Sequence, residues 1–315
     1  MATPLLGQSK VDKILSQFSQ RYTSEDFICD LILPVLKVKE KTGKFAKYGK
    51  ENLRIFGGGL LRAPGTRAKG VNYSVAQGTY SCSERSDEKG IPWEMYANYD
   101  DPYDPKRDAV ALCKDLIQQD KEYALASVLA NNSVITHYTN LLTTDKWSDK
   151  VNSDPLDDLL TACGNVRSRT GRWPNLLVLS YNVMVALKFH PVIRDQVKYT
   201  PGRSTGGSIT NAELVQVLGD LINVKEVLVG NAVYNSAAEG QTDVIADIWA
   251  NNAWVIYRTP KPTLMEATFG MTVTDVLDVV DGYPEQQTKQ DFVRATVSFD
   301  QNIMDTDFAE RIGAL

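Results

Sequence analysis

The stretch from Val35 to about Met95 most limits what this chain can fold into, because it is rich in lysine and glycine and has little apolar periodicity. Glycines such as Gly43, Gly49 and Gly78 interrupt it too often for a long helix. We therefore predict an extended β-hairpin arm. An isolated hairpin is marginal in water, so another surface has to hold it, and a neighbouring subunit could supply that surface.

The charge of the chain is divided unevenly along the sequence. Between Lys37 and Lys69, ten basic residues stand against two acidic ones, a local balance of +8, and the sign reverses between residues 70 and 105. The net charge of the whole chain is -5, which argues against a protein whose main task is to bind nucleic acid phosphates. Such a layout would let the basic segment of one copy contact an acidic surface of another, although a solvated face explains the charge equally well.

Composition indicates an ordinary soluble globular protein, since 43% of the 315 residues are apolar and 23% are charged. No apolar stretch is long enough for a signal peptide or a membrane span, so we expect a cytosolic protein that contacts no membrane. The cysteines are widely spaced and contain no zinc or disulfide pattern, and we expect reduced thiols at Cys29, Cys82, Cys113 and Cys163.

The clearest expected element is a long helix from residue 104 to about residue 130. Asp104 is a favourable N-cap, Pro105 suits the first helical position, and neither glycine nor proline follows up to Ala130. Helical spacing predicts one apolar stripe, consisting of Ala109, Leu112, Leu116, Tyr123, Ala126 and Ala130.

After a polar linker, the pattern changes to short alternating helices and strands, which predicts an α/β domain over residues 151–260. Ser153 or Asp154 should cap its first helix and Gly171 should end it, while Leu176–Leu179 is a run suited to a buried strand. Thr210 or Asn211 should cap a later helix. The remaining residues, 261–315, return to strands, so the predicted fold class is α+β.

No enzyme signature emerges from the residues that could carry chemistry. His137 and His190 are the only histidines and lack metal-site spacing, so we interpret both as structural. Ser180 follows a predicted strand but lacks the flanking glycines of a nucleophile elbow, and an N-cap role explains it better. The glycine-rich loops lack a phosphate-loop ending, and the paired aspartates, such as Asp157 and Asp158, are explained as well by helix-start electrostatics as by catalysis. We predict no catalytic, cofactor-binding or metal-binding residue.

The order of these elements resembles the major capsid proteins of tailed double-stranded DNA bacteriophages, which share the Hong Kong 97-type fold. The resemblance covers nearly the whole chain and depends on the joint order of several phrases. The phrases are VLKVKEKTGKFAKYGKENL (Val35–Leu53), RAPGTR (Arg62–Arg67), PYDPKRD (Pro102–Asp108), PNLLVLS (Pro174–Ser180) and AEGQTDVIADIW (Ala238–Trp249).

The resemblance implies how the chain is divided and what it does. It implies an N-terminal arm (1–34), a hairpin called the E-loop (35–100), a peripheral domain with a spine helix (101–150), an axial domain (151–260) and a C-terminal part of the peripheral domain (261–315). The chain would be a non-enzymatic subunit that forms the pentamers and hexamers of an icosahedral phage head around double-stranded DNA. The expected contacts between subunits lie on the basic side chains of the E-loop, namely Lys44, Lys47, Lys50, Arg54, Arg62 and Arg67.

Further partners follow from the same resemblance. We expect a separate scaffold protein or none, because only about 34 residues precede the hairpin, together with a portal at one vertex and, in some heads, a decoration protein. The packaged DNA would be contacted without sequence preference, in a capsid assembled in the bacterial cytoplasm. No lysine or asparagine is singled out for the isopeptide crosslinks that some members form.

Two other functions stay open at this point. The nearer is an encapsulin, a bacterial cargo shell of the same fold, which would contain an enzyme rather than DNA. The more distant is a cytosolic α/β enzyme that uses Ser180 or the Asp157 region, which would require a deep pocket with a perturbed acid or base.

Overall fold

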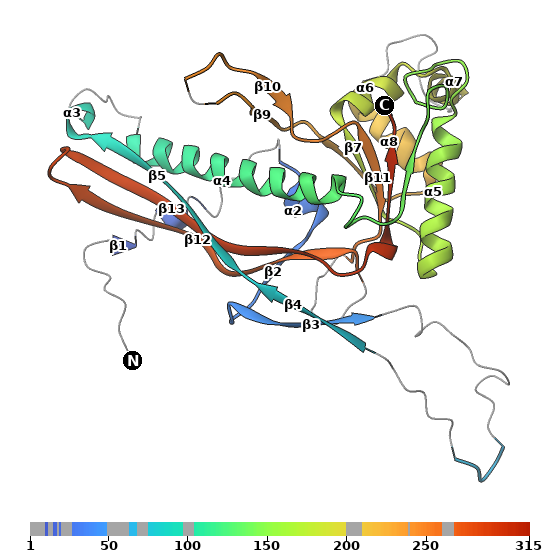
Figure 1. The fold of residues 1–315 in the computed structure, drawn as a ribbon, viewed down its shortest axis with the longest axis horizontal. Helices are drawn as coiled ribbons and strands as arrows, with labels where there is room; N and C mark the ends of the chain where they lie inside the picture. Colours follow the sequence, from blue (N-terminus) through green and yellow to red (C-terminus); the bar gives the residue numbers. More distant parts are fainter. Residues whose placement is uncertain are drawn as a thin grey trace.

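The computed structural model describes residues 10–11, 15–17, 19, 27–48, 63–67, 75–96, 104–199, 210–238, 240–259 and 268–315. Helix α4 (Pro105–Ala130) runs through the molecule and links a long, twisted sheet to an α/β domain (Figure 1). Its predicted ends are confirmed, because the Asp104 side chain accepts a hydrogen bond from the Lys106 amide at 3.0 Å and Pro105 is the first helical residue.

The long sheet lies along one side of α4. Its strand order is β1-β12-β13-β5, with β2 parallel to β12 and all other pairs antiparallel. The strands of this sheet are β1 (Lys10–Val11), β2 (Val35–Lys37), β5 (Ser83–Pro92), β12 (Gly270–Glu285) and β13 (Gln290–Ile303). Short helices α2 (Cys29–Ile32) and α3 (Trp93–Tyr96) flank it. The predicted alternation in the C-terminal strands is confirmed where Val293 and Ala295 pack against α4.

The apolar stripe predicted for α4 is wrong in part. Leu112, Leu116 and Tyr123 are exposed, whereas the buried face includes Val110, Ile117 and other residues one position away from the expected ones. The prediction failed because that buried face also contains Lys114, Lys121 and Glu122, whose polar groups have specific buried partners that a periodicity argument does not see.

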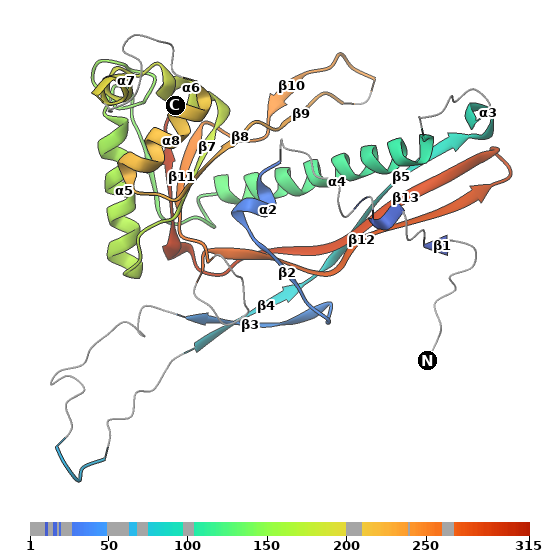
Figure 2. The ribbon, with the colours of Figure 1, turned by 180° about the vertical axis from the view of Figure 1, so that it is seen from behind.

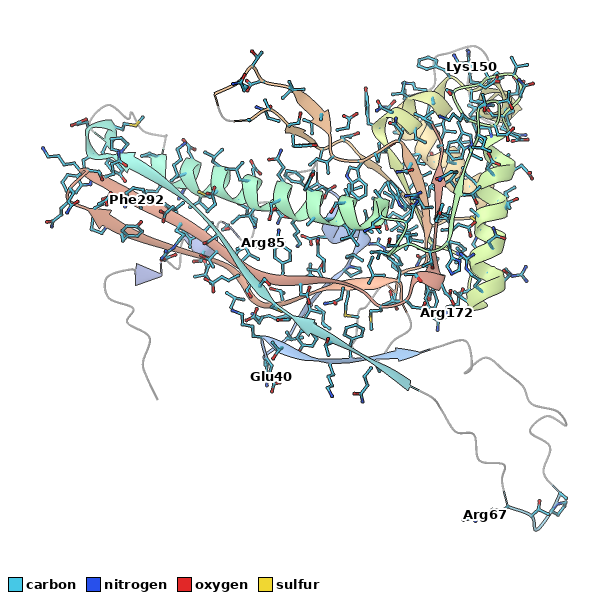
Figure 3. The ribbon with its side chains drawn as sticks, in the orientation of Figure 1. Glu40, Arg67, Arg85, Lys150, Arg172 and Phe292 are labelled. Carbon is cyan, nitrogen blue, oxygen red and sulfur yellow. The ribbon has the colours of Figure 1, made fainter. Side chains whose placement is uncertain are left out.

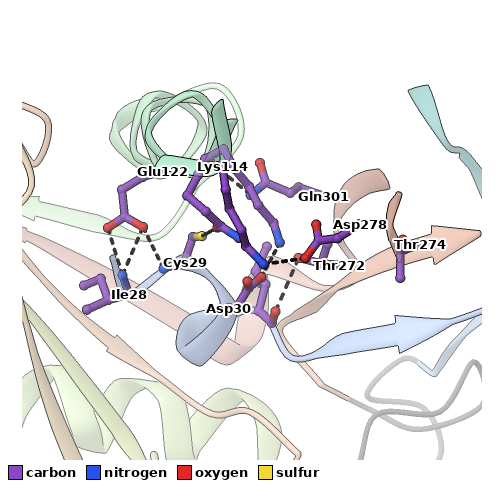
Figure 4. A network of polar contacts seen from close by, with 12 residues as sticks. Ile28, Cys29, Asp30, Lys114, Glu122, Thr272, Thr274, Asp278 and Gln301 are labelled. Carbon is purple, nitrogen blue, oxygen red and sulfur yellow. Dashed lines mark hydrogen bonds and ion pairs between the residues drawn. The ribbon is translucent and has the colours of Figure 1, made fainter. Parts of the chain in front are cut away.

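A buried carboxylate fastens the N-terminal segment to α4 (Figure 4). Glu122 is fully buried and accepts hydrogen bonds from the amides of Ile28 and Cys29, at 3.1 and 2.7 Å, and from the Trp249 indole at 2.7 Å. Burial raises the pKa of Glu122. Because the three donors come from two distant parts of the chain, this carboxylate joins the residues before β2, helix α4 and the α/β domain.

Two lysines of α4 add ion pairs to the same arrangement. Lys121 pairs with Asp30 in α2, and Lys114 pairs with Asp278 in β12 and also donates to the Ser19 carbonyl. Both lysine side chains are almost completely buried, so their charges depend on these partners.

The α/β domain is built around a second sheet, with the order β6-β14-β11-β7-β8. Its strands are β6 (Tyr138–Asn140), β7 (Leu176–Ser180), β8 (Glu226–Gly230), β11 (Asn252–Ile256) and β14 (Ala309–Gly313). The helices packed on it are α5 (Pro155–Thr170), α6 (Tyr181–Lys188), α7 (Pro191–Tyr199) and α8 (Asn211–Ile222). A short hairpin, β9 (Val233–Asn235) and β10 (Ile245–Asp247), extends from it over α4 in both views (Figures 1 and 2).

Most local predictions for this domain are confirmed. The Asp154 side chain caps α5 and Gly171 ends it in the left-handed conformation, with φ of 72°. Thr210 and Glu213 form a reciprocal capping box at α8. Ser180 stands at the N-cap position of α6, but its hydroxyl makes no capping hydrogen bond.

The last strand departs from the predicted division of the chain. Although residues 261–315 were expected to belong with the peripheral part, β14 pairs with β11 at the centre of the second sheet, following the one-turn 3-10 helix η2 (Thr306–Phe308). Ile312 of β14 packs into the core of that sheet. The C-terminus therefore completes the α/β domain.

We expect the substitution Glu122→Gln to lower the free energy of unfolding by about 1 to 3 kcal/mol, because it places an amide NH2 against backbone and indole donors in a buried site. Urea denaturation followed by circular dichroism measures this change. Ser127→Ala, on the exposed side of the same helix, should shift the midpoint far less. Equal midpoints for Glu122→Gln and the wild type would contradict the role of the carboxylate.

Candidate functional site: the hairpin arm and its anchor

The hairpin arm is formed by β3 (Thr42–Tyr48) and β4 (Val75–Ser81), which pair with each other and with no other strand in the described part of the chain. The register runs from Thr42 opposite Ser81 to Tyr48 opposite Val75. The paired arm is therefore narrower than the predicted span of 35 to about 95, since β2 before it pairs with β12 and β5 after it pairs with β13. Strands β2 and β5 belong to the long sheet, because each forms its backbone hydrogen bonds with a strand of that sheet.

The base of the arm is fixed by a small apolar cluster. Phe45, Tyr80 and Cys82 pack with Met271 and Val273 of β12 and with Met304, which directly follows β13. The Ser81 amide donates to the Asp300 carboxylate at 2.8 Å, and the Cys82 amide donates to the Lys41 carbonyl at 2.9 Å. Burial raises the pKa of the Cys82 thiol to about 11, so this thiol stays protonated and acts as a small apolar side chain.

Two aromatic rings lie over glycines on the opposite strand. Tyr80 is directly opposite Gly43, and Phe45 is directly opposite Gly78. A Cβ atom added at either glycine would fall well inside van der Waals contact with the facing ring. The glycines that make this stretch a poor helix thus also make room for the rings that hold the hairpin together.

A shallow depression of about 490 Å³ lies beside this base. It is lined by Thr42, Gly43, Lys44, Thr79, Tyr80, Ser81 and Asp300. Its polar groups come from the hairpin and from Asp300 of β13, and they do not include a base paired with a nucleophile. The depression therefore lacks the arrangement that an α/β enzyme would need.

The predicted contact residues fall in three places relative to the described structure. Lys44 is exposed on β3, and Arg67 is exposed in a turn that Figure 3 shows well away from both five-stranded sheets. Lys47 lies in β3 by its backbone. The remaining predictions, Lys50, Arg54 and Arg62, fall outside the described residues. Among the described residues, no ion pair involves Lys44 or Arg67, so the structure does not bring these two together through a shared partner.

The other candidate residues have structural surroundings. His137 pairs with Asp307 at 2.8 Å, and His190 is buried against the Ser153 hydroxyl at 3.1 Å, where burial lowers its pKa. The Trp147 indole donates to Asp158 at 2.8 Å. Within the described ranges, no group of three or more histidine, cysteine, aspartate or glutamate side chains is arranged to hold a metal ion. The helices in that part of the chain also include none with the length and hydropathy of a membrane span.

Charge counting alone missed the residues that position the arm. Phe45 and Tyr80 decide where the hairpin is anchored, yet the sequence signal for them is weak. Phe45 stands between lysines, and Tyr80 stands in a run of small and polar residues. Once β3 and β4 are aligned, the pairing of each aromatic residue with a glycine becomes recognisable. That alignment requires a register that only the structure shows.

Comparisons with solved structures place this architecture among capsid proteins. The chain matches a phage-related protein of Bordetella bronchiseptica with a TM-score of 0.76 and 24% identity, covering 98% of both chains. It matches the capsid protein of the cyanophage P-SCSP1u with a TM-score of 0.60 and 13% identity, covering 92% of this chain and 89% of the other. The chain has the Hong Kong 97-type capsid fold. A virus-like particle from Pyrococcus furiosus shares this fold, with a TM-score of 0.55 and 12% identity over 95% of both chains.

Two curated relatives are similar in sequence over most of the chain. A protein of Burkholderia phage BcepMu, named a major capsid protein, is 26% identical over 307 residues, which is 94% of this chain and 94% of the relative. A protein of Pseudomonas phage JBD67 with the same name is 26% identical over 267 residues, covering 83% of this chain and 82% of the relative. No family model matches. The expected fold is therefore confirmed.

We expect Gly78→Ala to lower the free energy of unfolding by about 1 to 3 kcal/mol, because the added methyl group overpacks against the Phe45 ring. The control is Gly164→Ala, in the middle of α5, where an added Cβ meets no atom within 4 Å. This control should leave stability unchanged or raise it by up to about 1 kcal/mol. Thermal unfolding of both variants measures the difference, and a change of the same sign in both would contradict the packing argument.

Proposed function

We propose that this chain is the major capsid protein of a tailed bacteriophage, a structural subunit that self-assembles into the shell of the head. The observation that carries the proposal is the similarity to two phage proteins named major capsid protein, over 94% and 83% of this chain. The fold supports it independently, because the structural neighbours include phage capsid proteins matched over nine-tenths of this chain.

The arm gives the proposal its physical mechanism. Among the described strands β3 and β4 form a sheet of their own, and the apolar cluster at their base together with the Ser81–Asp300 hydrogen bond ties them to the long sheet. A two-stranded hairpin of this kind gains stability when a neighbouring surface covers it. We propose that Lys44, Lys47, Lys50, Arg54, Arg62 and Arg67 bring such a surface to the arm, and that the surface belongs to an adjacent copy.

Strand β5 is a suitable acidic surface for that contact. Glu84 and Glu88 are exposed and alternate with Arg85 and Asp87 along this edge strand. Arg85 pairs with Asp120 of α4, so strand alternation directs Glu84 and Glu88 to the opposite face of the sheet. The arm of one copy and β5 of the next therefore offer opposite charges, which favour one orientation of association.

Repeated head-to-tail contacts of this type close into rings. An arm that contacts a different surface on its neighbour makes a heterologous interface, and such interfaces close into pentamers or hexamers when the rotation allows. In the proposed head, the α/β domain lies near the five-fold and six-fold axes, and the long sheet with α4 lies toward the periphery.

The net charge of the chain suits a shell subunit that encloses DNA without binding its phosphates strongly. With a net charge of -5, the subunit makes few strong phosphate contacts, which would otherwise impede packaging and ejection of the genome. A separate scaffold protein, a portal at one vertex, a decoration protein and assembly in the bacterial cytoplasm belong to the same proposal. The chain acts as a structural protein rather than an enzyme, in agreement with its relatives.

An encapsulin-like cargo shell is the second candidate, because the virus-like particle from Pyrococcus furiosus has the same fold. The two functions differ in what the shell contains. Nuclease-resistant DNA in purified particles supports the phage head, whereas a co-purified enzyme without DNA supports the cargo shell.

We expect the double substitution Lys44→Glu and Lys47→Glu to block shell formation while leaving the subunit folded, because it reverses the charge at two positions of β3 and leaves the residues of the apolar cluster unchanged. Electron microscopy and light scattering measure assembly. A compact chain of this length has a radius of gyration of about 20 Å, against hundreds of ångströms for a closed shell. Circular dichroism measures the fold.

The matched control is Lys44→Arg with Lys47→Arg, which keeps both charges and should assemble like the wild type. Shells formed normally by the Glu variant would show that these charges are not needed for the contact. An unfolded Glu variant would show that the arm is part of the subunit's own core, and would contradict the proposal in its present form.

A further inference from the structure

The side of helix α4 that faces away from the long sheet carries an apolar stripe. Leu112, Leu116 and Tyr123 are 43%, 46% and 47% exposed. They stand at positions i, i+4 and i+11, so they line one side of about three helical turns, a length of about 16 Å. Three large apolar side chains in a row on a solvated helix face need a further explanation, whereas a single one would not.

The hairpin β9–β10 lies over the C-terminal half of this stripe. The rings of Tyr123 and Tyr234 meet edge to face at 5.1 Å, and the Gln119 amide donates to the Val233 carbonyl at 2.7 Å. The hairpin projects along α4 in both ribbon views (Figures 1 and 2). Leu112 and Leu116 precede Tyr123 in the helix and lie closer to its N-terminus. The hairpin thus contacts the Tyr123 end of the stripe, and all three apolar side chains remain more than 40% exposed.

The hairpin adds apolar area on the same side. Ala246 pairs with Tyr234, and Val244 lies two residues before Ala246, so strand alternation directs all three toward α4. Val244 is nevertheless 54% exposed. We call Leu112, Leu116, Tyr123, Tyr234 and Val244 together the helix–hairpin surface.

The charges around the helix–hairpin surface are acidic. Asp108 and Asp115 lie beside the stripe on α4, whereas Asp120 is paired with Arg85. The two lysines in the same part of the helix, Lys114 and Lys121, are buried on the other side. From Asn231 to Asn252 the sequence contains no lysine or arginine, and Asp243 is exposed in the hairpin. An acidic border disfavours nucleic acid phosphates and favours a basic partner.

We propose that the helix–hairpin surface is a docking site for an amphipathic helix of another protein, with an apolar face bordered by lysine or arginine. An exposed stripe with spacing i, i+4 offers the ridges and grooves that a second helix packs into. The partner is a different protein because the chain outside Lys37–Lys69 has a net charge of -13, so a second copy offers mostly acidic side chains. The proposal does not depend on shell formation.

The test uses the full chain as unassembled subunits and two labelled 18-residue peptides. Both peptides carry leucine at helical spacing on one face, and the other face carries lysine in the first peptide and glutamate in the second. Fluorescence anisotropy should show that the lysine peptide binds at least 10-fold more tightly than the glutamate peptide, with an advantage that shrinks at high salt. Equal binding of the two peptides would overturn the proposal.

Two variants locate the binding. The double substitution Leu112→Ser with Leu116→Ser should weaken binding of the lysine peptide at least 10-fold. The control, Leu142→Ser with Val151→Ser, changes other exposed apolar residues and should leave this binding unchanged. The double substitution Asp108→Lys with Asp243→Lys leaves the apolar side chains in place. It should weaken binding of the lysine peptide and strengthen binding of the glutamate peptide. This second variant keeps the test valid if the leucine variant shifts the melting temperature.

A second copy of this chain is the competing occupant of the helix–hairpin surface, and it predicts a different experimental result. If Leu112→Ser with Leu116→Ser abolishes self-association of the chain and leaves peptide binding unchanged, a second copy covers the surface and the proposal is wrong. Because peptide binding is measured on subunits, a failure of this proposal is separate from a failure to form shells.

Discussion

The buried face of helix α4 is the interaction on which the rest of the structure depends. It packs against β5 and β13 of the long sheet through Val110, Cys113 and Ile117. At its C-terminal end, the Trp254 indole donates to the Leu129 carbonyl at 3.2 Å, and the Arg311 guanidinium donates to the Ala130 carbonyl. One helix thus connects two sheets whose described strands do not pair with each other, and it helps to fix the relative position of the two parts.

The same face carries charge into the core, which makes the connection specific as well as stable. Glu122, Lys121 and Lys114 each have a partner from a segment far away in sequence. A buried charge without its partner is costly, so these contacts exclude arrangements in which the N-terminal segment or β12 is displaced along the helix. In a shell subunit, a rigid body of this kind gives the arm a defined origin from which to reach a neighbour.

The sequence predicts the hairpin arm better than it predicts which face of α4 is buried. Glycine, lysine and the lack of apolar periodicity were enough to predict an extended hairpin that needs a neighbour, and its paired strands are confirmed over 42–48 and 75–81. Its exact extent was not predictable, because β2 and β5 have strand-like sequences too, and only their pairing with β12 and β13 removes them from the arm. On α4, helical spacing allowed two adjacent faces, and the structure buries the one that periodicity did not favour.

The sequence alone determined the local elements of this protein. Asp104 with Pro105, Asp154 with Gly171, and Thr210 with Glu213 set helix ends through contacts within a few residues, so neighbouring side chains carry all the information needed. Tertiary structure alone decided which face of α4 is buried, that β14 joins the second sheet, and that Phe45 and Tyr80 anchor the arm. These outcomes depend on partners that are distant in the chain, and the free energy of burying a side chain is set by the surface that it meets rather than by its sequence neighbours.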